Sequence, residues 1–221
     1  MSPAPQPRRR VPLALVLVGV VAVVLLGAVA FGALRNSDGK PSKSDGASTS
    51  GLVQVQPVNV TGNPLPEFPG NGSADPAVSI EAPVLKGRSF DGSKVTIGGK
   101  TAKPTLVMFM AHWCPHCQRE VPLVVQWRAD GTIPDDVDLV GVSTGVMSDQ
   151  NNYPPSAWLD EVKWPGPVMA DSGRDAAAAA FGLPSYPYFV ALDADGKVIA
   201  RGSGELDQAA MQDLVAQLQG T

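Results

Sequence analysis

Both cysteines of this 221-residue chain, Cys114 and Cys117, fall in one short string of sequence. The string reads His-Trp-Cys-Pro-His-Cys over positions 112–117, and it also holds both histidines of the chain. Two thiols at this spacing can exchange a disulfide, because the first attacks a partner disulfide and the second, one helical turn on, displaces the captured partner. The spacing therefore makes Cys114 the attacking thiol and Cys117 the resolving thiol.

The flanking residues predict a buried strand that leads directly into a helix. Residues 105–110 form a continuous apolar run typical of a central strand, and residues 118–128 have a helical pattern. Cys114 then lies where a helix begins, and unpaired N–H groups and the helix dipole favour a thiolate there. Pro115 suits the first turn because it has no N–H, and His116 can carry a positive charge beside the sulfur.

The rest of the chain predicts strands that alternate with helices, which favours an α/β fold with a mixed central sheet flanked by helices. We expect strands at 137–142 and 167–170, helices at 155–162 and 174–181, and a β-hairpin over 188–200 with an Asp-Gly turn. A terminal helix places its apolar residues on one face. These residues are Leu206, Ala210, Leu214, Val215 and Leu218.

Other interpretations of the cysteine pair are weaker. A metal site would need two more ligands, and the only histidines, His112 and His116, belong to the same short string, so four ligands converge on one ion with difficulty. A structural disulfide that closes so small a loop gains little chain entropy. We expect His112 to be merely solvated. No metal or cofactor is expected, because the cysteines themselves carry the electrons.

The N-terminal region predicts a membrane anchor. Residues 11–34 carry no charge, and as a helix they cover about 36 Å, enough for a hydrocarbon core of about 30 Å. Three arginines at positions 8–10 precede the run, so we expect a short cytoplasmic tail at 1–10 and a translocated C-terminal part. Cleavage near Ala30 is the alternative and would give a secreted protein. The net charge of −4 offers no basic footprint for nucleic acid.

Residues 35–75 are rich in Ser, Gly, Pro, Asn and Asp, which predicts a flexible linker, and the globular domain is predicted to span residues 76–221.

Within the domain the sequence resembles the thioredoxin superfamily, and most of all its membrane-anchored TlpA/ResA-like thiol–disulfide oxidoreductases. Phe109, Ala111 and Trp113 fit, with the two cysteines, the F-x-A-x-W-C-x-x-C string of the family. Glu120 and Pro122 fit the E-x-P that follows in the TlpA-like branch.

A second segment carries the same resemblance. Phe181-Gly182-Leu183 through Tyr186-Pro187 fits the Y-G-V-x-x-x-P segment of the family, and the residues at 144–181 look like the strand-helix insert of this branch. The resemblance implies that Pro187 is a cis-proline facing the cysteines, with the Tyr186 backbone available to an extended substrate strand. It also implies that Trp113 covers the disulfide, with a plain packing role as the alternative.

One departure changes the expected proton chemistry. Plain thioredoxins carry a buried Asp in the strand before the cysteines, where this chain has Met108. The resemblance then makes Glu120 the acid that takes the proton of Cys117, because it lies three residues further on the same helix face. The alternative is that Glu120 only pairs with His116 at i,i+4.

The resemblance implies an enzyme that exchanges electrons with protein disulfides or dithiols outside the cytoplasm, served by a membrane electron donor or oxidant protein. The overall likeness favours a reductase or electron-transfer role, as in cytochrome c maturation. The Pro-His pair between the cysteines is similar to that of DsbA, so a disulfide-forming oxidase is the alternative. A copper-binding assembly module ranks lower, since no histidine follows His116. A thiol peroxidase is rejected, because Val107 and Ala111 stand where its motif needs Pro and Thr or Ser.

Overall fold

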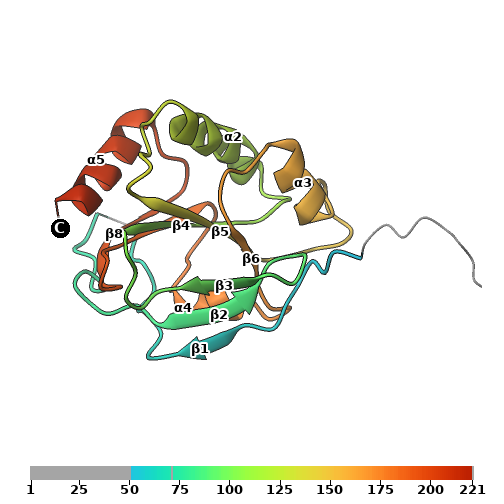
Figure 1. The fold of residues 1–221 in the computed structure, drawn as a ribbon, viewed down its shortest axis with the longest axis horizontal. Helices are drawn as coiled ribbons and strands as arrows, with labels where there is room; N and C mark the ends of the chain where they lie inside the picture. The colour runs from blue at the N-terminus through green and yellow to red at the C-terminus, as the bar shows by residue number, and fades with distance from the viewer. Residues whose placement is uncertain (1–50, 71, 221) are drawn as a thin grey trace, which may run out of the picture. The chain divides into compact units, whose positions relative to one another are not determined.

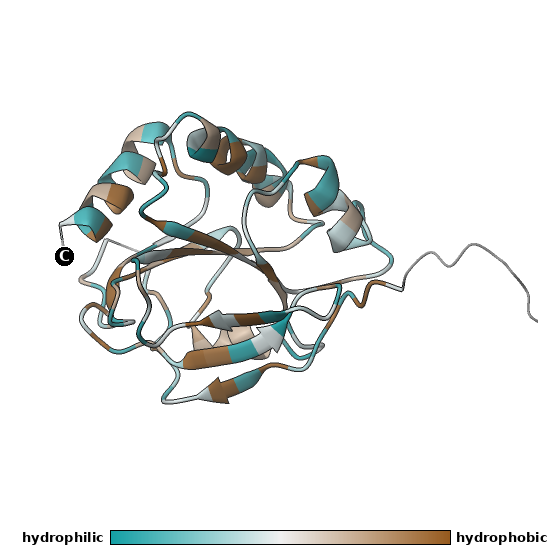
Figure 2. Ribbon diagram, viewed as in Figure 1, coloured by the Kyte–Doolittle hydropathy of each residue, from teal (hydrophilic) through white to brown (hydrophobic). Residues whose placement is uncertain are grey.

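The computed structural model describes residues 51–70 and 72–220. At its centre lies β4 (Thr105–Met110), in which every residue is buried. Its side chains alternate between two hydrophobic cores: Leu106 and Met108 enter one, and Val107 and Phe109 enter the other. This packing explains why β4 reads as an unbroken apolar run, as Figure 2 shows for the central strands.

The eight-stranded sheet is mixed, as the sequence predicts. β4 pairs in parallel with β5 (Asp138–Ser143) and antiparallel with β7 (Tyr188–Leu192). The strand order is β1-β2-β6-β5-β4-β7-β8, and β3 pairs with β2 off this path. The remaining strands are β1 (Asn59–Thr61), β2 (Val84–Arg88), β3 (Lys94–Ile97), β6 (Val168–Ala170) and β8 (Val198–Ser203).

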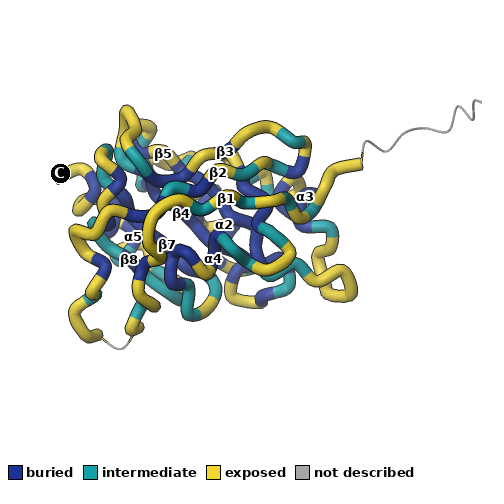
Figure 3. Tube along the Cα trace, turned by 90° about the horizontal axis from the view of Figure 1, so that it is seen from below, coloured by how far each residue is buried: buried dark blue, intermediate teal, exposed yellow. Residues whose placement is uncertain are grey.

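Helices cover both faces of the sheet (Figure 1). On one side lie α2 (Pro115–Ala129), α3 (Pro155–Glu161) and α5 (Gln208–Gln219), whose apolar residues share the core that Leu106 and Met108 enter. On the other side lies the short α4 (Ala176–Ala180). The buried residues follow the central strands and the inner helix faces, whereas exposed residues lie on the outer loops (Figure 3).

The predicted elements within the domain are confirmed, with small shifts at their ends. The β7–β8 hairpin closes through its Asp-Gly turn, where Asp193 Oδ1 accepts the amide of Lys197 at 2.7 Å and Gly196 has a φ of +84°. α4 begins two residues later than predicted, because Asp175 before it is left-handed at φ 54°. In α5 the buried face also contains Met211, which the apolar pattern missed.

The domain begins earlier than the sequence predicts, so the linker boundary at residue 75 is wrong. β1 pairs with β2, and Leu65 is buried with its amide bonded to Ala180. Asp75 forms an ion pair with the completely buried side chain of Arg201. A segment rich in Ser, Gly and Pro looks like a tether by composition, but here contacts with residues more than 100 positions away hold it in place.

The predicted membrane anchor at 11–34 lies outside the described residues, as do the predicted tail at 1–10 and most of the first half of the linker. Among the residues that the structure does describe, no helix is long and apolar enough to cross a bilayer.

Candidate active site

The first turn of α2 begins at Cys114, as predicted. Cys114 is the N-cap residue, with extended backbone at φ −71° and ψ 121°, and Pro115 follows at the first helical position. The Cys114 amide donates to Ala111 O at 3.1 Å, and its carbonyl accepts the first helical bond from Gln118 at 3.0 Å. The first turn contains no acidic residue, so nothing in it opposes the attraction of the helix dipole for an anion at this sulfur.

The two cysteines differ in access. Both thiols are free, Cys114 retains 6 % exposure, and Cys117 has none. The Cys117 sulfur is in hydrogen-bonding contact with Cys114 and with the backbone of Ala111. Burial raises the pKa of the Cys117 thiol far above its usual value, and the neighbouring Cys114 and Glu120 add to this effect. Cys117 is therefore a protonated, shielded thiol that is reached through Cys114.

Glu120 is a fully buried carboxyl group behind the cysteines. Its Oε1 accepts the amide of Leu206 at 3.0 Å, whereas its Oε2 has no hydrogen-bond partner. Burial raises the pKa of Glu120 to about 7, against the lowering effect of the Leu206 bond. The alternative pairing with His116 is not formed, because the His116 ring is exposed and binds another carboxylate.

That carboxylate belongs to Glu205, in the loop between β8 and α5. His116 Nδ1 lies 2.5 Å from Glu205 Oε1, and Arg119 Nε donates to the same carboxylate at 3.1 Å. Glu205 stands 89 residues from His116 along the chain, and no local pattern in the sequence signals the pairing.

His112 is completely buried, so the expectation that it is merely solvated is wrong. Its Nε2 accepts the Met147 amide at 3.2 Å, and its Nδ1 therefore carries the proton and donates to Asn151 O at 2.7 Å. The ring also meets Tyr153 edge-on, with centroids 6.0 Å apart. His112 thus fastens the loop between β5 and α3 beside the cysteines, which is why a polar residue is tolerated at the end of an apolar strand.

Trp113 and Tyr186 form the opposite wall of the site. Trp113 is half-buried, and its Nε1 donates to Gly145 O at 2.7 Å while its ring meets Tyr186 at 85° with centroids 5.9 Å apart. The Tyr186–Pro187 bond is cis, as predicted, and Tyr186 O accepts a long hydrogen bond of 3.9 Å from Cys114 Sγ. These contacts show the packing role of Trp113, and its covering of the disulfide stays a prediction.

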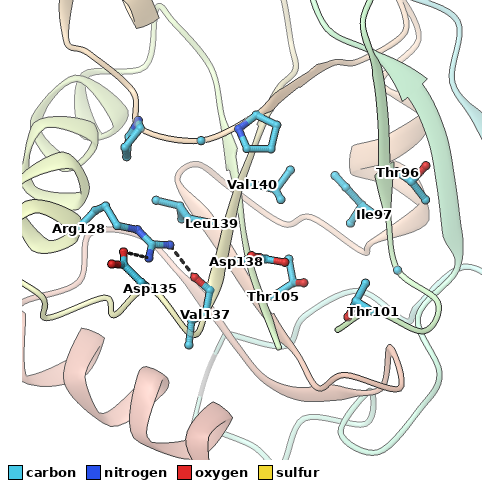
Figure 4. Close-up of a pocket in the computed structure, with 14 residues that line it drawn as sticks. Thr96, Ile97, Thr101, Thr105, Arg128, Asp135, Val137, Asp138, Leu139 and Val140 are labelled. Carbon is cyan, nitrogen blue, oxygen red and sulfur yellow. Dashed lines mark hydrogen bonds and ion pairs between the residues drawn. The ribbon is translucent and has the colours of Figure 1, made fainter. Parts of the chain in front are cut away.

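A cavity of about 480 Å³ lies elsewhere on the domain. Its lining includes Thr105 and Asp138, the first residues of two parallel strands, whereas Cys114 lies beyond Met110, at the other end of β4. Figure 4 shows Arg128 turned toward Asp135 and the Val137 carbonyl. The Arg128 guanidinium donates hydrogen bonds to backbone carbonyls and so holds the loop before β5 in place. The cavity takes no part in chemistry at the cysteines.

The sequence-predicted site residues thus converge: both cysteines, Glu120, Trp113, Tyr186 and Pro187 lie around one helix start. The segment at 204–206 and the β5–α3 loop complete the site and were not predicted. Both histidine rings already have partners, and within the described ranges no three His, Cys, Asp or Glu side chains are grouped to hold a metal ion.

The chain is similar to known proteins. The family model described as Redoxin matches residues 61–218. Methylamine utilization protein MauD of Methylophilus methylotrophus is 29 % identical over 129 residues, which are 58 % of this chain and 56 % of that protein. MauD of Paracoccus denitrificans is 32 % identical over 130 residues, 58 % of this chain and 59 % of that protein. The chain thus spans less than two thirds of the length of these relatives.

The fold has counterparts among solved structures. The crystal structure of StoA from Bacillus subtilis superposes with a TM-score of 0.50 at 22 % identity, over 63 % of this chain and 98 % of StoA. That likeness extends to the fold and agrees with the mixed sheet and the helix that starts at Cys114. The chain belongs to the Redoxin family, and its fold is the thioredoxin-like α/β fold that the sequence resemblance predicts.

Proposed function

We propose that the protein passes two electrons from the dithiol of Cys114 and Cys117 to disulfides of other proteins on the extracytoplasmic side of a membrane. One observation carries the proposal: a reachable sulfur at a helix start stands in front of a fully buried thiol and a buried carboxyl group with a pKa of about 7. Each of these three groups has one step to perform.

In the reducing direction, the Cys114 thiolate attacks one sulfur of the client disulfide. A Cys114–client disulfide forms, and the other client sulfur leaves as a thiolate. Cys117 then gives its proton to the Glu120 carboxylate and attacks Cys114 Sγ, which releases the second client thiolate. The products are a Cys114–Cys117 disulfide and a client dithiol, so two electrons have moved, and Glu120 serves as the general base.

The client is proposed to bind as an extended strand along the Tyr186 backbone. The Tyr186 carbonyl oxygen lies 3.9 Å from the Cys114 sulfur, and Trp113, whose ring contacts the Tyr186 ring, supplies an apolar surface there. Main-chain pairing of this kind accepts many sequences, which suits an enzyme that acts on protein chains.

The reducing direction is supported by Glu120 and by the likeness to the TlpA/ResA-like branch. A dithiol client that must accept haem, as in cytochrome c maturation, and a membrane electron donor are the proposed partners. The Pro-His pair between the cysteines supports the alternative, a disulfide-forming oxidase. The two directions correspond to potentials of about −270 mV and about −120 mV, so equilibration of the full chain with glutathione decides between them.

Anchoring by residues 11–34, with the domain outside the cytoplasm, is part of the same proposal. If protease added to intact spheroplasts cleaves the domain, the result supports this placement. If the domain is cleaved only after lysis, the result contradicts it. Release of the domain as a soluble protein instead identifies cleavage near Ala30. The copper-binding module remains the lower-ranked alternative, and stoichiometric copper binding without thiol–disulfide exchange favours it.

The decisive test of the chemistry is the Cys117→Ser variant of the full chain. Without the resolving thiol, the Cys114–client disulfide cannot be displaced, so we expect trapped adducts that dithiothreitol releases. The matched control is Cys114→Ser, which leaves only the fully buried Cys117 and forms no adduct. Absence of adducts at Cys114 in the Cys117→Ser variant contradicts the proposed function.

A further inference from the structure

Glu205 joins the exposed side of the active-site helix to the loop that precedes α5. Its carboxylate faces His116, at 2.5 Å, and Arg119, whose Nε donates to both carboxylate oxygens at 3.1 and 3.2 Å. Both partners lie in the first two turns of α2, and His116 stands between the two cysteines in sequence. The cluster of His116, Arg119 and Glu205 therefore adjoins the reactive dithiol.

The backbone fixes the position of Glu205 independently of its side chain. The amide of Gly204 donates to Pro187 O at 2.8 Å, and the amide of Leu206 donates to Glu120 Oε1 at 3.0 Å. Glu205 lies between these two anchored residues, so the loop backbone positions its carboxylate beside α2. Replacing the carboxylate by an amide leaves both backbone bonds available and removes only the charge.

A thiolate at Cys114 competes with Glu205 for the same two side chains, Arg119 and His116. Arg119 interacts electrostatically with Cys114, and His116 is two residues from it in the same turn. The hydrogen bonds from Arg119 and His116 lower the pKa of Glu205 to about 2, so the carboxylate stays charged throughout the neutral range. While the carboxylate is charged, Glu205 Oε1 lies 2.5 Å from His116 Nδ1, and Arg119 Nη2 lies 3.0 Å from the same ring nitrogen, so the ring is held on the Glu205 side.

We propose that Glu205 is a positioning residue that keeps the dithiol reducing by holding the His116 ring away from the Cys114 sulfur. A cation beside a thiolate stabilises the reduced form and makes a dithiol more oxidising. Withdrawing that cation has the opposite effect and makes the protein a stronger electron donor. The inference rests on the proposed thiol–disulfide exchange and names the residue that sets its direction.

The test compares Glu205→Gln with the wild-type full chain, purified in detergent and equilibrated with glutathione at pH 7. We expect the equilibrium constant for reduction of the protein disulfide by glutathione to rise about tenfold, which corresponds to about 30 mV. In a His116→Ala background the same substitution changes the constant less than threefold, because the ring that would turn to the sulfur is absent. Glu81→Gln is the matched control, since it removes one exposed carboxylate beside Lys197, at the end of the β7–β8 hairpin opposite Pro187.

A constant for Glu205→Gln within twofold of wild type overturns the inference, and so does an equal rise in the two backgrounds, which means that the Glu205 charge acts without His116. Both results leave the proposed function intact, because the dithiol still equilibrates with glutathione. Failure of the wild-type dithiol to equilibrate at all refutes the proposed function instead.

Discussion

Replacement of Glu120 by Gln removes a buried charge whose cost depends on pH. Burial raises the pKa of Glu120 from 4.5 to about 7, so between these values the folded protein holds a proton that the unfolded chain has lost. The stability associated with this proton is complete below about pH 4.5 and is lost as the pH rises through 7. At about 1.4 kcal/mol for each pKa unit, the loss amounts to about 3 kcal/mol at pH 8.

Glutamine keeps an oxygen for the Leu206 amide and carries no charge at any pH. The variant should therefore gain about 3 kcal/mol in unfolding free energy relative to wild type between pH 4 and pH 8. Urea unfolding of the reduced full chain in detergent, followed by tryptophan fluorescence, measures this difference. All four tryptophans of the chain lie between positions 113 and 164, so the signal reports on the domain.

The difference between the two proteins isolates Glu120. Asp171 is another buried carboxyl group with a raised pKa, also because of burial, but it titrates in both proteins and cancels. A stability difference that stays constant within 1 kcal/mol from pH 4 to pH 8 would refute the assignment of Glu120 as the buried proton acceptor.

Three further outcomes are expected. Glu120→Gln should slow the resolving step about 100-fold at pH 8 in stopped-flow measurements, and an unchanged rate would exclude a general-base role. Asp75→Asn removes the negative charge that pairs with the buried guanidinium of Arg201 and should reduce the unfolding free energy by about 3–5 kcal/mol in urea, whereas a loss under 1 kcal/mol contradicts the burial argument. His112→Phe removes the acceptor of the Met147 amide, so hydrogen exchange at that amide should accelerate at least tenfold, and unchanged protection would show that the loop needs no such bond.

Local patterns were sufficient to predict the elements that carry the cysteines. The run at 105–110 is apolar because β4 is covered on both faces, and a proline after Cys114 marks the helix start. The Asp-Gly turn predicts the β7–β8 hairpin, and the helical spacing of apolar residues predicts the terminal helix. Each of these signals lies within a dozen residues, and the structure confirms them.

What could not be predicted depends on contacts between distant positions. The Glu205–His116 pair joins residues 89 positions apart, and the Asp75–Arg201 pair joins residues 126 positions apart. The burial of His112 does not follow from its neighbours in sequence for the same reason, since its partners Asn151 and Met147 lie in another loop. Polar residues look solvated in a sequence until the chain that satisfies them is known.

Because Cys117 is completely buried, partner proteins can form a mixed disulfide only with the sulfur of Cys114. In the proposed exchange, an electron donor and a client both form their covalent intermediate with Cys114, and they cannot do so at the same time. The proposal therefore predicts ping-pong turnover, in which each partner leaves before the next one enters. Excess donor should then inhibit the reaction by occupying the sulfur that the client requires.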